Sequence, residues 1–182
     1  MTLIRGYMAM SLDGYIADVD GGYGFLNRYD RVDYGFDAFI STIGTCVFGR
    51  TTYDQSVATP GDAWPFAGKR IIVVTSRPLS GEPANVAGVE VWYRGVGAGL
   101  VDHLRAATGG DVWIVGGGKL QAAFFEMDAI DRMDATIIPV LLGDGIRMFP
   151  PAVPKQRWLE LADIRRFPLD GLILDYRRPA SA

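Results

Sequence analysis

The stretch WIVGGGKL, residues 113–120, joins a run of bulky apolar residues to three consecutive glycines and a lysine. The apolar run is typical of a buried strand. A helix beginning near Lys119 would carry Leu120, Phe124 and Met127 on one side. The glycines therefore lie between a strand and a helix start, where backbone N–H groups and the positive helix end favour a phosphate. A tight turn without a ligand is the alternative.

Two well-known phosphate motifs do not fit this stretch. The pattern G-x-G-x-x-G requires glycine where Gln121 stands. The pattern G-x-x-x-x-G-K-[ST] requires glycine in place of Trp113 and a hydroxyl in place of Leu120. The argument for a phosphate site remains, because it depends on the strand, the glycines and the helix start. The missing side chains of Gly117 and Gly118 would let a phosphate come close to the backbone.

Two other strands are followed by residues that suit an anion. FGRTTYD, residues 48–54, places an arginine and two threonines at a predicted helix start, and VVTSR, residues 73–77, ends in two hydroxyls and an arginine. Ligands of open α/β sheets bind outside the carboxyl ends of the strands. Three such ends predict a shared anion site. A threonine cap beside a surface arginine is the alternative for residues 48–54.

Strands and helices alternate along the chain up to about residue 140. Phe36, Phe39, Ile40 and Ile43 fall on one face of a predicted helix, which Gly44 would end. Two strand-like runs, residues 157–167 and 171–178, flank a short connection and predict a hairpin. The sequence thus predicts an α/β fold with a mostly parallel sheet, a terminal antiparallel hairpin and one domain over residues 1–182.

Composition narrows the function classes. The 182 residues carry a net charge of −3 without a basic cluster, which argues against a nucleic-acid partner. The sequence contains no apolar run of membrane-spanning length and no signal-peptide pattern, so we expect a cytoplasmic protein without a membrane partner. Cys46 and His103 are the only residues of their types. We therefore expect neither a metal site nor a histidine-based triad, and a cofactor with its own reactivity becomes attractive.

Five motifs, in order, carry a resemblance to a known family. They are MAMSLDGYIA (8–17), FGRTTYD, VVTSR, WIVGGGKL and IPVLLGDGIRMF (138–149). Together they resemble the dihydrofolate reductase superfamily and, more closely, the C-terminal reductase domain of the bifunctional riboflavin-biosynthesis deaminase/reductase. The resemblance spans residues 3 to about 178. It implies a dihydrofolate-reductase-like three-layer fold with about eight strands, and an NADPH-dependent reduction like that of 5-amino-6-(5-phosphoribosylamino)uracil.

The resemblance also implies which residues hold NADPH. The nicotinamide is expected to lie beside Ala9, Ser11, Asp13 and Gly14. The pyrophosphate is expected between Gly49, Arg50 and Thr51 on one side and Gly116, Gly117, Gly118, Lys119 and Leu120 on the other. The adenosine ribose and its 2′-phosphate are expected to face Thr75, Ser76 and Arg77. The guanidinium of Arg77 favours NADPH over NADH, because it complements a ribose phosphate.

An acid on the first helix contacts the pterin in dihydrofolate reductases, and its offset from Gly49 implies Asp33 as the catalytic residue here. A helical wheel places Asp33 at the border of the apolar face, where a half-buried carboxylate can bind a heterocycle or pass a proton. The alternative is an acid favoured only by the helix dipole. Asp37 is the neighbouring candidate.

The chain also departs from its relatives. Tyr15 stands where riboflavin-pathway reductases carry lysine, residues 18–32 do not match their substrate-phosphate region, and the deaminase motifs are absent. The first loop lacks the tryptophan of dihydrofolate reductases. A dihydrofolate or pterin reductase, or a non-catalytic NADPH-binding module, therefore remain alternatives to the aminouracil reductase. Relatives commonly form dimers, and we expect a homodimer.

Overall fold

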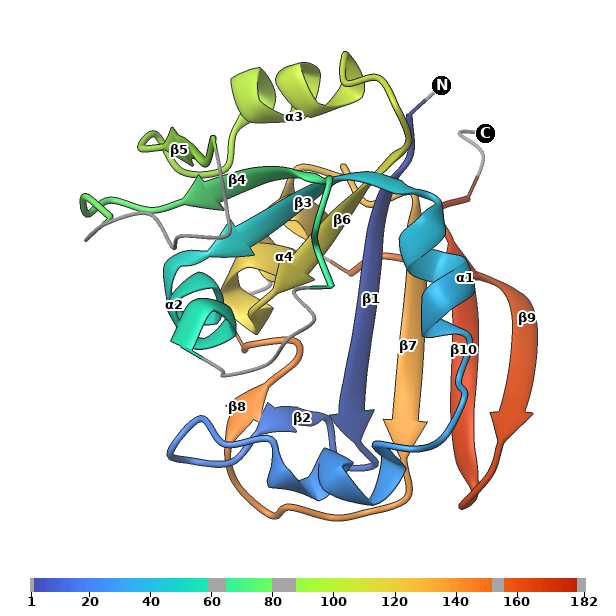
Figure 1. Ribbon diagram of the computed structural model, residues 1–182. Helices are drawn as coiled ribbons and strands as arrows, with labels where there is room; N and C mark the ends of the chain where they lie inside the picture. The colour runs from blue at the N-terminus through green and yellow to red at the C-terminus, as the bar shows by residue number, and fades with distance from the viewer. Residues whose placement is uncertain (1, 59–64, 80–87, 152–155, 180–182) are drawn as a thin grey trace.

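The structure is a computed structural model that describes residues 2–58, 65–79, 88–151 and 156–179 (Figure 1). Its elements are, in chain order, β1 (Ile4–Ser11), β2 (Tyr15–Ala17), the 3-10 helix η1 (Gly24–Tyr29), α1 (Phe36–Ser41), β3 (Ile43–Gly49), α2 (Arg50–Ala58), β4 (Arg70–Val74), β5 (Glu90–Trp92), α3 (Ala98–Arg105), β6 (Asp111–Gly116), α4 (Gly118–Glu126), β7 (Arg132–Ile138), β8 (Ile146–Arg147), β9 (Glu160–Phe167) and β10 (Gly171–Arg177).

Eight strands form one sheet in the order β5-β4-β3-β6-β1-β7-β10-β9, and β2 pairs with β8 in a small second sheet. The strands from β5 to β7 run parallel, while β10 runs antiparallel to both β7 and β9. The mostly parallel sheet and its C-terminal hairpin are thus confirmed. Because parallel strands end at the same edge, this topology brings the glycine after β6 beside the end of β3. Phe48 pairs with Gly116 in the register.

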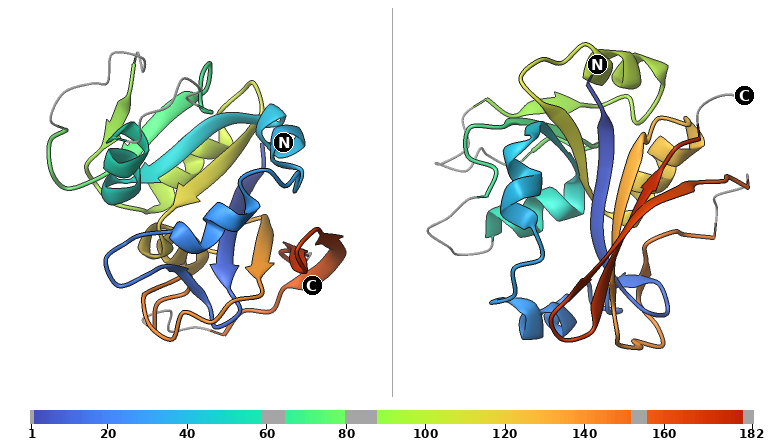
Figure 2. Two further views of the ribbon diagram at one scale, coloured as in Figure 1. Left: turned by 60° about the horizontal axis from the view of Figure 1, so that its bottom comes forward. Right: turned by 90° about the vertical axis from the view of Figure 1, so that its right-hand side faces the viewer.

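Helices cover both faces of the sheet, which confirms the three layers (Figure 2). On one face, α3 and α4 bury Leu100, Leu104 and Phe124 against the sheet. On the other face, α1 and α2 bury Phe39 and Tyr53 in a largely aromatic cluster. Alternate residues of one strand enter opposite clusters, as the period of two in a strand requires.

The first helix is shorter than the sequence indicates. It begins at Phe36 and ends at Ser41, so Ile43, expected on its apolar face, is instead the first residue of β3. Gly35 caps the N-terminus of the helix with a φ of 81°, which is a left-handed conformation. The helix therefore does not extend back to Asp33. The short elements η1, β2 and β8 carry no periodic pattern and were not expected.

In the part of the chain that the structure describes, no helix is both long and apolar enough to cross a bilayer. His103 lies on α3, where its Nε2 atom is 2.9 Å from the carboxylate of Glu90, and its ring packs against Trp92. It lines neither of the two cavities described below.

Candidate functional site

A cavity of about 740 Å³ lies at the carboxyl ends of β1, β3 and β6. We call it the larger cavity. The residues that line it include many of those assigned to NADPH: Ala9, Gly49, Arg50, Thr51, Gly116, Gly117, Gly118, Lys119 and Leu120. Thr52, Tyr23 and Leu26 are among the further lining residues that were not assigned. The predicted convergence of the strand ends at 49 and 116 is therefore present in the fold.

Glycines give this cavity a wall of bare backbone. A Cβ atom on Gly49 would lie 3.3 Å from the carbonyl oxygen of Gly116. At Gly116 the φ angle of 146° and the nearby methyl of Met8 disfavour any side chain. At Gly117, the atom that a Cβ would approach most closely is Thr52 Oγ1, at 3.7 Å. A Cβ atom there would therefore make only an ordinary van der Waals contact. The Gly116–Gly117 peptide bond is cis.

Gly118 lines the same cavity but has a different role. A Cβ atom there would overlap the carbonyl oxygens of Arg147 and Met148, the second at 2.9 Å. Gly118 is thus needed so that the start of α4 can pack against the chain at β8. Both glycines line the cavity, but they differ in what a side chain would meet: a Cβ atom has open space at Gly117 and overlaps the backbone of β8 and its neighbour at Gly118.

Two helices begin at the larger cavity, and each carries a basic residue. α2 starts at Arg50 and α4 starts at Gly118, just before Lys119. The first turn of each helix leaves backbone N–H groups without partners in the helix, which suits a phosphate. Arg50 donates to the carboxylate of Asp54 at 2.7 Å and to the carbonyl of Pro78 at 2.6 Å. It therefore also ties the segment after β4 to α2.

Ser11, Asp13 and Gly14 do not line the larger cavity, although the resemblance placed them beside the nicotinamide. Ser11 is fully buried, donates from Oγ to Asp13 at 2.6 Å and accepts the N–H of Tyr15 at 2.9 Å. The Asp13 carboxylate also accepts the N–H groups of Leu142 and Gly143. These residues fasten the loop between β1 and β2 to the segment after β7, and so support the cavity wall from behind.

The hydroxyl of Ser11, followed by the backbone N–H groups of Gly143 and Leu142, lowers the pKa of Asp13 to about 2. Since an aspartate in the unfolded chain titrates near pH ~4, the carboxylate stabilises the fold at neutral pH, and this contribution is lost as pH falls from ~4 to ~2. We expect Asp13→Asn to lower the melting temperature at pH 7 by several degrees, because an amide cannot accept all of these bonds. The wild-type advantage should shrink toward pH 2.

Asp102→Asn, on the exposed side of α3, is the matched control for thermal melts between pH 2 and pH 7. It should follow the wild-type curve. An Asp13→Asn protein whose deficit is unchanged from pH 7 to pH 2 would contradict the role given to the carboxylate.

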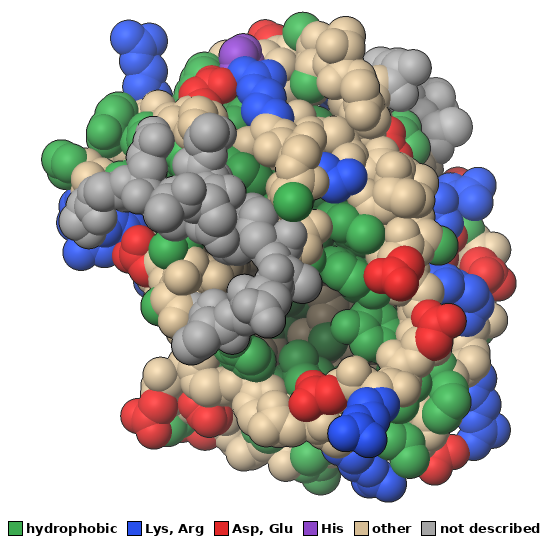
Figure 3. Space-filling view, viewed as in Figure 1, with side chains coloured by type: hydrophobic (Ala, Val, Ile, Leu, Met, Phe, Trp, Pro, Cys, Tyr) green, Lys and Arg blue, Asp and Glu red, His purple; other side chains and the backbone are tan. Residues whose placement is uncertain are grey.

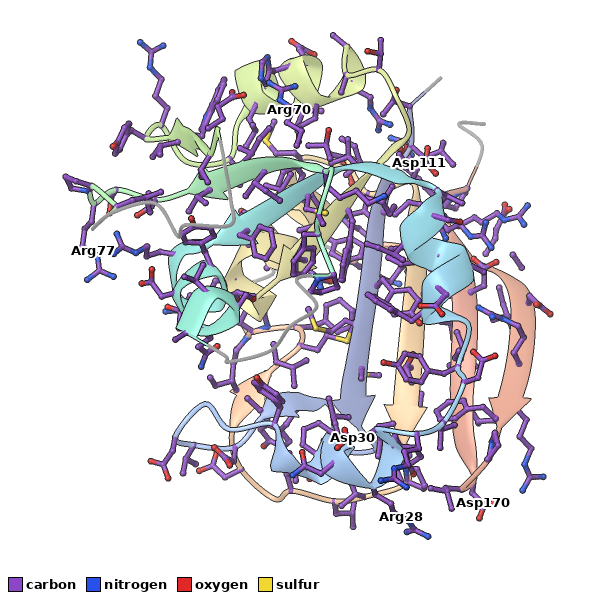
Figure 4. All side chains as sticks on the ribbon, viewed as in Figure 1. Arg28, Asp30, Arg70, Arg77, Asp111 and Asp170 are labelled. Atoms are coloured by element: carbon purple, nitrogen blue, oxygen red, sulfur yellow. The ribbon has the colours of Figure 1, made fainter. Side chains whose placement is uncertain are left out.

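Thr75, Ser76 and Arg77 follow β4 at the same sheet edge but lie outside the larger cavity. Thr75 is buried, and its hydroxyl both accepts from the N–H of Arg77 at 3.1 Å and donates to the carbonyl of Arg77 at 3.2 Å. Ser76 and Arg77 are exposed, and Figure 4 shows Arg77 extending from the left edge of the molecule. Contact between these residues and the adenosine ribose of NADPH therefore stays a prediction.

A smaller cavity, of about 310 Å³, lies next to the larger one. The two cavities share Ala9, Tyr23 and Leu26. The space-filling view in Figure 3 shows a hollow with a hydrophobic floor, acidic side chains to its right, and an acidic side chain next to a basic one at its lower rim. Parallel pairing places Ala9 of β1 beside Thr136 of β7, so that both lie on the floor of the smaller cavity with Tyr7.

The walls of the smaller cavity are mostly aromatic. They come from η1, from the start of α1, and from β6 and β9: Tyr23, Tyr29, Tyr34, Phe36, Trp113 and Phe167, with Asn27 and Asp30 at the end of η1. Sequence reasoning missed these residues. Tyr7 and Thr136 look like ordinary strand residues in the sequence, and only the pairing of β1 with β7 reveals that they meet.

Two hydroxyl groups at this cavity lack a partner. Within the described residues, neither Tyr7 Oη nor Thr136 Oγ1 makes a hydrogen bond, although both atoms are buried. A buried hydroxyl without a partner costs about 1–3 kcal/mol. Burial, and then the nearby Tyr34 and Asp134, raise the pKa of Tyr7 well above its usual value, so its hydroxyl stays protonated at neutral pH. No hydrogen bond from the described residues occupies either hydroxyl, and both residues line the smaller cavity.

Asp33 lines neither cavity. Its side chain is exposed, and Oδ1 accepts the N–H of Gly35 at 2.8 Å, ahead of α1 rather than within it. The expected half-buried carboxylate on the first helix is therefore wrong, and the reason is the left-handed Gly35. Asp37 is also exposed. The acidic residue that does line the smaller cavity is Asp30.

Comparison with known proteins defines the class. The family described as RibD C-terminal domain matches residues 3–173, and the chain belongs to this family. Its fold superposes with a TM-score of 0.86 on a protein from Shewanella sp. PV-4 that has been assigned to riboflavin biosynthesis, at 26% identity over 98% of this chain and 100% of that one.

Other relatives extend the comparison. The chain is 37% identical to the uncharacterized protein YwjB of Bacillus subtilis over 79% of its length and 80% of that protein. The fold also matches a diaminohydroxyphosphoribosylaminopyrimidine deaminase/5-amino-6-(5-phosphoribosylamino)uracil reductase of Thermotoga maritima, with a TM-score of 0.71 and 16% identity. That match covers 98% of this chain but 57% of the Thermotoga protein, and at this identity it supports the fold alone.

Proposed function

We propose that the protein is an NADPH-dependent oxidoreductase of the cytoplasm that reduces a small heterocycle, in the manner of the aminouracil reductases of riboflavin biosynthesis. The observation that carries the proposal is the pair of connected cavities. One is walled by glycines, helix starts and two basic residues, as a dinucleotide needs. The other is aromatic, is of the size of one or two rings, and meets the first at Ala9. Membership of the family supports the same class of reaction.

The residues of the larger cavity fit a dinucleotide. Gly117 offers open backbone, α2 and α4 offer N–H groups, and Arg50 and Lys119 offer positive charge to a pyrophosphate. Bound NADPH would supply a hydride to the substrate. The chain would position both ligands across Ala9, and Tyr23 and Leu26 would exclude water from the place where the cavities meet.

The proposed reductase differs from a non-catalytic NADPH-binding module in its second cavity. The unpaired hydroxyls of Tyr7 and Thr136 favour a second ligand, which such a module does not need. Oxidation of NADPH, followed by absorbance, would be measured with an aminouracil and with a dihydropterin. Turnover of the aminouracil supports the proposal, and turnover of the dihydropterin supports a pterin reductase. NADPH binding without turnover of either supports the module.

Arg77 tests the choice of cofactor. We propose that it contacts the 2′-phosphate of NADPH, so Arg77→Ala should weaken NADPH about tenfold or more and leave NADH unchanged, as loss of one charge-assisted contact implies. Calorimetric titration with both nucleotides measures the ratio. Arg94→Ala, another exposed arginine, is the control. Equal affinities of the wild type for NADPH and NADH would overturn the proposed cofactor preference.

We propose a homodimer formed through β9, the strand at the edge of the sheet. Within the described chain, nearly all of β9 is exposed, and Trp158, Leu161 and Ile164 present apolar side chains there. An edge strand with exposed apolar residues is suited to pairing with a second copy. Light scattering should give twice the chain mass, and Ile164→Asp should give a monomer. Tyr93→Asp, beyond the opposite edge at β5, should stay dimeric, and a monomeric wild type would refute the proposal.

A further inference from the structure

We propose that the smaller cavity binds a planar heterocycle that carries no phosphate group. This inference rests on the proposed reductase function and narrows its substrate class. The proposed substrate differs from 5-amino-6-(5-phosphoribosylamino)uracil, which the name of the Thermotoga enzyme gives and which bears a 5-phosphoribosyl group.

The charge around the smaller cavity supports the inference. None of the described residues that line it is a lysine, arginine or histidine, and Asp30 is its charged residue. Proteins bind phosphate groups with arginine, lysine or the N-terminus of a helix. A phosphate dianion in this cavity would meet tyrosine rings and a carboxylate, without a fixed positive charge. Figure 4 shows Arg28, the basic residue of η1, pointing downward and away from the hollow.

The basic residues behind the cavity are already neutralised. Arg5 is 2.9 Å from the carboxylate of Asp134, and Arg165 lies 3.7 Å from the same carboxylate. Arg165 also faces Asp163 at 3.9 Å. Arg5 also lies 3.7 Å from Asp111, so two arginines face three aspartates here and the group offers a substrate no net positive charge.

The start of α1 also borders the cavity, but acids occupy it. Phe36 is the first residue of this helix and lines the cavity. The N–H of Gly35 is bonded to the Asp33 carboxylate at 2.8 Å, and Asp37 stands in the first turn. Burial, then Asp30 and Asp37, raise the pKa of Tyr34, which agrees with a negative potential on this side. The negative electrostatic potential at the start of α1 therefore opposes the binding of an anion in the smaller cavity.

The larger cavity leaves no separate place for a substrate phosphate. Among the described residues that line it, Arg50 and Lys119 are the basic ones, and both stand where the proposed cofactor would place its pyrophosphate. An uncharged ring in the smaller cavity would instead stack on aromatic side chains and satisfy the hydroxyls of Tyr7 and Thr136.

Matched ligand pairs test this inference in the full chain saturated with NADP⁺, which prevents turnover. One pair is 5-amino-6-ribitylaminouracil with and without its 5′-phosphate, and the other is dihydroneopterin with and without its phosphate. Affinities are measured by calorimetry, with quenching of tryptophan fluorescence as a second readout. The unphosphorylated member of at least one pair should bind tenfold or more tightly than its partner. Asp30→Asn should reduce that ratio at least threefold, by strengthening binding of the phosphorylated member.

Tyr7→Phe and Thr136→Val test the hydroxyls. Each should weaken the unphosphorylated ligand about tenfold, as loss of one hydrogen bond to a buried group implies, without changing NADP⁺ affinity. Equal or tighter binding of a phosphorylated member overturns the inference, and so does the absence of binding by all four ligands. A protein that binds the unphosphorylated ring but not NADP⁺ would instead refute the proposed function and leave the ligand class standing.

Discussion

Gly117→Val is expected to weaken NADPH binding by about 10–100-fold while the protein melts within about 2 °C of the wild type. The valine side chain would occupy the space in front of Thr52, where the structure offers open cavity rather than protein atoms. Displacing a phosphate from its backbone contacts costs about 1.5–3 kcal/mol, which is the stated loss of affinity. The φ of −84° and ψ of −167° at Gly117 are ordinary for any residue, so the fold should tolerate the change.

Gly118→Ala, at the glycine next in the chain, is expected to destabilise the fold, which Gly117→Val should not do. Its Cβ would press into the backbone of Arg147 and Met148, and overlap of this kind costs about 3 kcal/mol or more. The melting temperature should fall by ~6 °C or more. Gly99→Ala, with no atom near its Cβ among the described residues, is the control for both changes. If Gly117→Val destabilised the fold as much as Gly118→Ala, the glycines would form a structural turn and nothing more.

Asp134→Ala is expected to destabilise the protein by about 3–5 kcal/mol, because it removes one member of a buried ion pair. The side chains of Asp134 and Arg5 are 2% and 9% exposed, and their charged groups are 2.9 Å apart. Arg5 Nε already lacks a partner among the described residues, so the guanidinium would lose its closest compensation. The melting temperature should fall by about 10 °C.

The control for this change is Asp163→Ala, which removes a half-exposed carboxylate from the same group. Asp163 lies 3.9 Å from Arg165, and its side chain is 58% exposed. Exposed pairs contribute about 0–1 kcal/mol, so its melting temperature should move by a few degrees at most. The double variant Arg5→Met/Asp134→Leu should recover much of the lost stability, since apolar residues of similar volume often replace a buried pair without loss. A double variant as unstable as Asp134→Ala would contradict this account.

The sheet was predictable because its signals are local. The runs before Gly49 and Gly116 are apolar, and both are followed by a helix start, so a sequence reader can place both at one edge of a parallel sheet. The hairpin of β9 and β10 was equally accessible, since two apolar runs flank a three-residue connection. Local patterns thus led to the larger cavity.

The smaller cavity was not predictable, because it depends on contacts between distant segments. Tyr7 and Thr136 meet only through the register of β1 with β7, which no local pattern reveals. The prediction that Asp33 is a half-buried residue of the first helix was wrong for a related reason. A helical wheel assumes an unbroken helix, and Gly35 adopts a left-handed conformation that the wheel cannot represent. Ser11 and Asp13 were expected beside the nicotinamide but do not line the larger cavity. A loop motif does not show which partners its side chains will bind, and here the Asp13 carboxylate binds the N–H groups of Leu142 and Gly143.

Ala9 belongs to both cavities, and this has a thermodynamic consequence. A molecule in the larger cavity becomes part of the boundary of the smaller one, so it changes the affinity for whatever enters second. Linkage requires the effect to be reciprocal: if the cofactor raises substrate affinity by some factor, the substrate raises cofactor affinity by the same factor. If the two cavities bind cofactor and substrate as proposed, contact between the ligands beside Ala9, Tyr23 and Leu26 would make the two equilibria interdependent without any change of conformation.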